Sequence, residues 1–165
     1  MGTLALEFAW LDIKKQNRIA LEWLLRYHQK LENYQEMINQ FNVLGATQYD
    51  GMPLSSDVGN PTLKKAVTLS ELEHMKKWLM TIEYTERTLP EKRLVFLELR
   101  RRAEQMNGKR EVGRPGWVDY VQAGYAEWHE RRYGQGYPPS KQTMTKWMDD
   151  IIDVTVRIAI RQGVL

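Results

Sequence analysis

Apolar side chains recur at intervals of three and four residues along most of the chain. This spacing runs from about Asp12 to Leu44 without a glycine or a proline, and it repeats from Pro61 to about Arg87. It places the apolar side chains on one face of a helix, as in the seam of a coiled coil. Two long helices with matching seams predict an antiparallel hairpin, or arms that pair between subunits.

Three shorter helices are expected after this hairpin, over about residues 88–107, 116–133 and 140–162. Gly, Pro, Ser and Asp crowd residues 45–60, which predicts a loop inside the hairpin. Gly163 is a suitable stop for the last helix. No segment has the alternation of a β-strand, and no internal repeat is found. The sequence therefore predicts an all-α fold, with a long helical hairpin over residues 1–88 and a helix-turn-helix-like lobe of three helices over residues 89–165.

The last predicted helix begins with a polar first turn that suits a DNA groove. Ser140 is a natural N-cap, because its hydroxyl can accept a hydrogen bond from a free amide at the helix start. Donors and acceptors fill the next two turns: Lys141, Gln142, Thr143, Thr145 and Lys146. The opposite face is apolar: Met144, Trp147, Met148, Ile151 and Ile152. A recognition helix presents its N-terminus to base edges in this way, and an ordinary capped amphipathic helix has the same pattern.

The charge of the chain is mildly basic and unevenly placed. The formal net charge is +3. Residues 1–88 carry 10 Lys or Arg and 11 Asp or Glu, whereas residues 89–165 carry 14 and 10. One group of cations lies in the last turns of the third predicted helix and in the loop after it, and is a candidate for DNA phosphate contacts: Arg100, Arg101, Arg102, Lys109, Arg110 and Arg114. Such contacts supply affinity and register without sequence information. A solvated helix end that complements the helix dipole is the alternative.

Several classes of function lack their characteristic residues. The absence of cysteine excludes disulfides, thiol catalysis and cysteine-based zinc sites, and it suits a reducing cytoplasm. His28, His74 and His129 have no metal-ligand spacing, and no phosphate-binding or nucleophile motif is present. No apolar run approaches the roughly 18 residues of a membrane span, and no secretory signal begins the chain. We therefore expect a cytoplasmic protein that is not an enzyme and needs no metal, cofactor or membrane.

Short motifs in two parts of the chain resemble a known family. Two of them lead into the second helix: Tyr49-Asp50-Gly51-Met52-Pro53 and Gly59-Asn60-Pro61-Thr62. They are similar to the loop-and-cap pattern of small Gram-positive phage and prophage regulators of the RinA/ArpU type, which activate late genes. Residues 89–100 resemble the first helix of the family's C-terminal module, which is akin to the helix-turn-helix of sigma-factor region 4. Residues 140–144 resemble the opening of its recognition helix. The turn from Gly134 to Pro139 departs from the pattern, because a compact helix-turn-helix has a turn of about three or four residues.

The resemblance implies a transcription activator of phage or prophage late genes that binds double-stranded DNA in a bacterial host cell. Groove contacts are expected from the helix that begins at Ser140. The hairpin is expected to mediate self-association as a homodimer or larger homo-oligomer, because paired modules read paired half-sites. Direct contact with RNA polymerase stays open. Two alternatives also stay open: a phage small terminase subunit, and a helical adaptor that binds a host polymerase or repressor, which the mild net charge permits.

Overall fold

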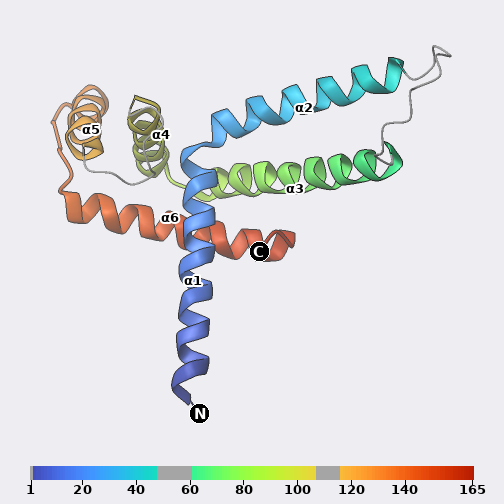
Figure 1. Cartoon of the computed structure of the whole chain (residues 1–165). Coiled ribbons are helices and arrows are strands. Elements are labelled where there is room, and N and C mark those ends of the chain that lie inside the picture. Colours follow the sequence, from blue (N-terminus) through green and yellow to red (C-terminus); the bar gives the residue numbers. More distant parts are fainter. Residues whose placement is uncertain (1, 48–60, 107–115) are drawn as a thin grey trace.

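The computed structural model of the chain describes residues 2–47, 61–106 and 116–165 (Figure 1). Within these ranges it holds six α-helices and no β-strand. The helices are α1 (Gly2–Leu25), α2 (Tyr27–Thr47), α3 (Pro61–Thr88), α4 (Glu91–Met106), α5 (Trp117–Tyr133) and α6 (Lys141–Gln162). The predicted all-α class is confirmed.

The first predicted long helix is in fact two helices. α1 ends at Leu25, α2 begins at Tyr27, and the chain changes direction at Arg26 (Figure 1). The guanidinium Nε of Arg101, on α4, donates a hydrogen bond of 2.7 Å to the carbonyl of Leu24. Basic side chains can satisfy the free carbonyls at a helix C-terminus in this way. The prediction of one helix over residues 12–44 was wrong. The break is stabilised by a residue far away in the sequence, and no glycine or proline marks it locally.

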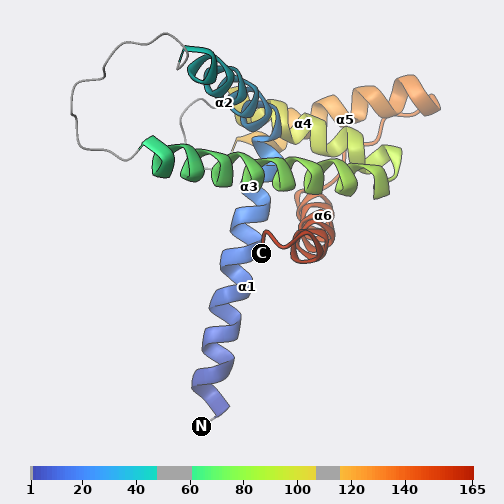
Figure 2. The ribbon, with the colours of Figure 1, turned by 90° about the vertical axis from the view of Figure 1, so that its right-hand side faces the viewer.

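α2 and α3 lie side by side as an antiparallel hairpin, which we call the arm (Figures 1 and 2). Where the arm meets the rest of the fold, Trp23 of α1 stacks on Trp78 of α3, with ring centroids 5.4 Å apart. Leu72, Leu79 and Ile82 of α3 are buried. α3 spans the predicted range within one residue. α2 continues to Thr47, so the first three residues of the predicted loop are helical, and residues 48–60 lie outside the described ranges.

One hydrophobic core joins all six helices. α6 crosses α1 and α3, and α4 packs on α5 at the other end of the molecule (Figure 1). Fully buried side chains come from both sides of residue 88: Leu24, Trp78, Ile82, Phe96, Leu97, Tyr125 and Ile151. Residues 1–88 and 89–165 therefore share a single core. The N-terminal half of α1 extends beyond it in both views (Figures 1 and 2).

Candidate nucleic-acid interface

The start of α6 is fixed by a side-chain cap. Ser140 has the extended backbone of an N-cap residue, with φ −67° and ψ 157°, and its Oγ accepts a 3.1 Å hydrogen bond from the Thr143 amide. The predicted cap at Ser140 is confirmed. The turn before it is also held, because Gln122 Nε2 on α5 donates a 2.9 Å hydrogen bond to the carbonyl of Pro139. The first turn of α6 is therefore attached both to its own cap and to α5.

The inner side of the first turns of α6 packs on aromatic rings. Met144 is completely buried. The Trp147 ring lies 5.4 Å from Phe96 of α4 and 5.3 Å from Tyr125 of α5, measured between centroids. The Arg93 guanidinium lies over the Trp147 ring, 4.5 Å from its centroid. Because α6 packs against both α4 and α5, its outer face has a defined orientation.

The outer face presents most of the side chains predicted for groove contacts. Lys141, Gln142, Thr145 and Lys146 are exposed, and neither lysine forms an ion pair with another described residue. The Thr145 hydroxyl donates to the Lys141 carbonyl at 2.9 Å, which leaves its lone pairs able to accept. Thr143 is half-buried, and its Oγ1 lies 2.9 Å from Ser140 Oγ. Thr143 thus takes part in the cap, and the other four side chains remain available to a ligand.

The arginine run was predicted to bind phosphate, and two of its three members cannot do so in this structure. Arg100 and Arg101 are each only 4% exposed. Arg100 pairs with Glu104 at 2.9 Å and stacks on Trp117. Its pKa is lowered by burial, which the hydrogen bond and charge of Glu104 oppose. Arg100 and Arg101 therefore both point inward, and the prediction of phosphate contacts was wrong for both.

Arg101 instead joins three helices. Besides its bond to Leu24, it pairs with Glu86 of α3 at 2.5 Å and lies 3.6 Å from Glu98 of α4. One terminal nitrogen, Nη2, is buried without a hydrogen-bond partner among the described residues. Arg102 alone in the run is exposed, and its Nε lies 3.8 Å from Glu98. The other three predicted phosphate contacts, Lys109, Arg110 and Arg114, lie outside the described residues.

Other cations lie at the N-terminal end of α4 and the C-terminal end of α5. Arg93 reaches Asp150 of α6 at 3.8 Å, which places the N-terminus of α4 next to this helix. Exposed Lys92 lies over the Tyr133 ring at 5.0 Å, and exposed Arg132 pairs with Glu91 at 3.5 Å. The sequence analysis did not single out these residues. The sequence does contain a signal for them, because one basic pair stands in the first turn of α4 and another in the last turn of α5. Consecutive antiparallel helices bring two such ends together.

α4 and α5 are packed closely and leave a groove along one side. A Cβ added to Gly124 would lie 2.7 Å from Leu99 Cδ2, so glycine permits the close approach of the two helices. The groove has a volume of about 570 Å³, and Tyr120 and Trp128 line it together with these two residues. Ion pairs occupy its charged positions: Arg102 with Glu98, and Arg131 with Glu127. The groove thus offers an apolar floor with a rim whose charges are already neutralised.

The described residues form no cluster of three or more His, Asp or Glu side chains that could hold a metal ion. His28 is 3.4 Å from Glu98, and His129 contacts the carbonyl of Gln135. None of the helices in the described ranges combines the length and the hydropathy that a membrane span requires. In comparisons with known proteins, no family model, no curated protein and no solved structure matched the chain.

Proposed function

We propose that this chain binds double-stranded DNA in a sequence-specific manner, with the first two turns of α6 in the major groove. The supporting observation is the capped start of α6, where Lys141, Gln142, Thr145 and Lys146 are exposed above a tightly packed apolar back. The major groove admits an α-helix, and Lys and Gln can form bidentate hydrogen bonds to guanine and adenine edges. The positive end of the helix dipole also favours the approach of phosphate groups.

In our proposal, cations of α4, α5 and α6 supply the electrostatic part of this interface. Lys92 and Arg132 project from the neighbouring helix ends, and Lys141 and Lys146 from α6 itself. Asp149 and Asp150 follow in the third turn and would repel phosphates, which confines the contact to the first two turns. The resulting footprint is small and mildly basic. It suits a protein whose affinity depends on base contacts and on the use of two copies.

The biological role that we propose is transcription activation of phage or prophage late genes, through DNA sites read by two α6 helices. This role rests on the resemblance of residues 49–62, 89–100 and 140–144 to late-gene activators of the RinA/ArpU type. The long turn between α5 and α6 differs from a compact helix-turn-helix. It nevertheless leaves the N-terminus of α6 exposed and held by Gln122.

Fluorescence anisotropy with labelled duplexes tests the proposal. The duplexes are tiled across the late-promoter region of the source genome, and a shuffled duplex of equal length and composition is the reference. A specific protein binds at least one tile about 10³-fold or more tightly than the shuffled duplex at physiological salt. Equal affinity for all duplexes would contradict sequence-specific recognition. No binding even at about 50 mM salt, where phosphate contacts are strongest, would contradict DNA binding altogether.

A further inference from the structure

The N-terminal part of α1 is an amphipathic helix without a packing partner among the described residues. We call residues 9–18 the stalk. Every side chain in it is exposed except Gln16, which is half-buried. Trp10, Leu11 and Ile13 are 55%, 55% and 54% exposed. The stalk therefore holds large apolar side chains in solvent.

The outer part of the arm carries a second exposed apolar surface. Val67 and Leu69 of α3 are 50% and 49% exposed. On α2, Phe41 is half-buried, and Lys65 Nζ lies 5.6 Å from the centroid of its ring. This contact shows that Phe41 and the start of α3 stand at the same level of the arm. Two separate extensions of the chain therefore leave apolar side chains in solvent.

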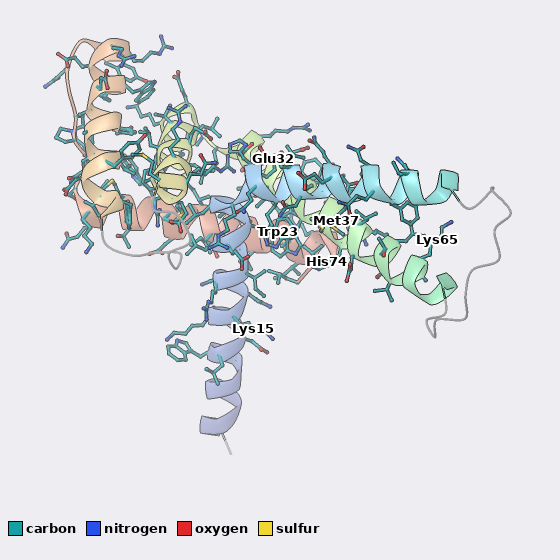
Figure 3. All side chains as sticks on the ribbon, turned by 45° about the horizontal axis from the view of Figure 1, so that its top comes forward. Lys15, Trp23, Glu32, Met37, Lys65 and His74 are labelled. Carbon is teal, nitrogen blue, oxygen red and sulfur yellow. The ribbon has the colours of Figure 1, made fainter. Side chains whose placement is uncertain are left out.

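The stalk and residues 31–43 of α2 carry charges of opposite sign, whereas the start of α3 adds the exposed cation Lys65. The stalk carries Lys14, Lys15 and Arg18 against a single carboxylate, Asp12. Residues 31–43 of α2 contain two exposed carboxylates, Glu32 and Glu36, and no cation. Figure 3 shows Lys15 on the free part of α1 and Glu32 on α2. Opposite potentials of this kind favour encounter and set the register of two surfaces.

The order of groups along the two extensions also matches. Counted from the break at Arg26, the stalk has cations 8 and 12 residues away, at Arg18 and Lys14, and α2 has carboxylates 6 and 10 residues away. Farther out, Trp10 is 16 residues from the break, and Val43 of α2, which is 63% exposed, is 17 residues from it. At 1.5 Å per residue, both apolar side chains stand about 24–26 Å from the break. Glu32, Glu36 and Val43 share one face of α2, because steps of four and seven residues return to nearly the same side of a helix. Charge therefore faces charge, and apolar side chain faces apolar side chain, if the two helices lie antiparallel with their breaks together.

We propose that the stalk of one copy lies along α2 of a second copy of this chain, and that the second copy returns the same contact. In Figures 1 and 2, α1 runs downward from the break and the arm runs sideways. A half-turn about the line that bisects these two directions exchanges them. One twofold operation therefore lays each stalk along the partner's arm, and the two helices are then antiparallel because α1 ends at the break where α2 begins. This is an isologous interface of the kind that most homodimers use.

The stalk and the arm both extend away from the core (Figures 1 and 2), so a second copy can reach both. The same symmetry places two α6 helices in equivalent positions, although the association itself does not require DNA.

Charge exchange between two variants tests this arrangement directly. The stalk variant combines Lys14→Glu with Arg18→Glu, and the arm variant combines Glu32→Lys with Glu36→Lys. All four side chains are exposed, so circular dichroism and thermal unfolding should show that both variants fold. Sedimentation equilibrium should show a dimer for the wild-type chain and dimerisation at least about tenfold weaker for each variant, because like charges would meet. A one-to-one mixture of the two variants should recover the dimer, since reversed stalk meets reversed arm and native stalk meets native arm.

A control variant has an equal charge change far from both surfaces: Lys141→Glu with Lys146→Glu. It should dimerise like the wild-type chain. A monomeric wild-type chain, or a ring of eight or more subunits, would overturn the proposal. An arm variant that dimerises normally would also overturn it, because stalks would then pair with something other than the arm. Native mass spectrometry with a mass tag on one variant distinguishes the mixed dimer from either parent, and its absence from the mixture would be a third contrary result.

Discussion

Arg101 binds the carbonyl of Leu24, a residue 77 positions away, and this hydrogen bond caps the end of α1. The same guanidinium pairs with Glu86 and faces the Tyr27 ring, so α1, α2, α3 and α4 meet at one side chain. The direction of α1 relative to the arm therefore depends on Arg101. A residue that looks like part of a DNA-binding run in the sequence has a structural role.

The first prediction concerns this structural role. Arg101→Gln should lower the free energy of unfolding by about 1.5–3 kcal/mol, the usual contribution of a hydrogen bond from a charged group. Arg102→Gln removes an exposed charge and should change it by less than about 0.5 kcal/mol. Urea denaturation of both variants measures the difference. Equal stabilities would show that the bond to Leu24 contributes little.

The sequence predicted the helices whose ends are marked locally. Pro61 begins α3, Gly134 and Gly163 follow α5 and α6 with positive φ, and these three helices were predicted within about one residue. Proline and glycine impose backbone geometry wherever they occur, so their effect is visible without a structure.

The sequence could not predict features that depend on contacts between distant helices. Three consecutive arginines on a helix point about 100° apart, and nothing local tells which of them faces a neighbour. In the structure Arg100 faces Trp117 of α5, Arg101 faces Leu24 of α1, and Arg102 faces solvent. By contrast, the exposure of Lys141, Gln142, Thr145 and Lys146 on α6 could be predicted, because it follows from a cap and an apolar stripe within one helix.

A second prediction separates the cap of α6 from its outer face. Ser140→Ala removes the hydroxyl that accepts from the Thr143 amide and should cost about 1 kcal/mol of stability. Ser140→Asp keeps a capping oxygen and should retain nearly wild-type stability, while it adds a negative charge at the proposed DNA surface. Its affinity for DNA should therefore fall more than that of the alanine variant. Thermal unfolding and anisotropy titrations on the same samples measure the two effects, and an aspartate variant that binds as tightly as the wild type would place this surface away from DNA.

A third prediction addresses base recognition. Gln142→Ala should weaken binding to the cognate site by about 1–3 kcal/mol, the value of one bidentate base contact, and should leave binding to shuffled DNA almost unchanged. Gln105→Ala, at an exposed position on α4, is the matched control and should alter neither affinity. The measurement is a pair of anisotropy titrations for each variant. Equal losses on cognate and shuffled DNA would remove Gln142 from base readout.

The last prediction concerns the phosphate contacts, where the structure redirects attention from the buried arginines to the ends of α4 and α5. Lys92→Gln and Arg132→Gln each remove one exposed cation at these helix ends. Each phosphate contact that is lost should lower the slope of log affinity against log salt concentration by about 0.9, because fewer counterions are released from the duplex. Specific and shuffled DNA should be affected alike, since phosphates carry no sequence information.

Lys76→Gln, at an exposed position on α3, is the control and should leave the slope unchanged. Slopes measured between about 50 and 200 mM salt decide the matter. If the slope stays constant in both variants while wild-type binding remains salt-dependent, the phosphate contacts come from elsewhere on the protein.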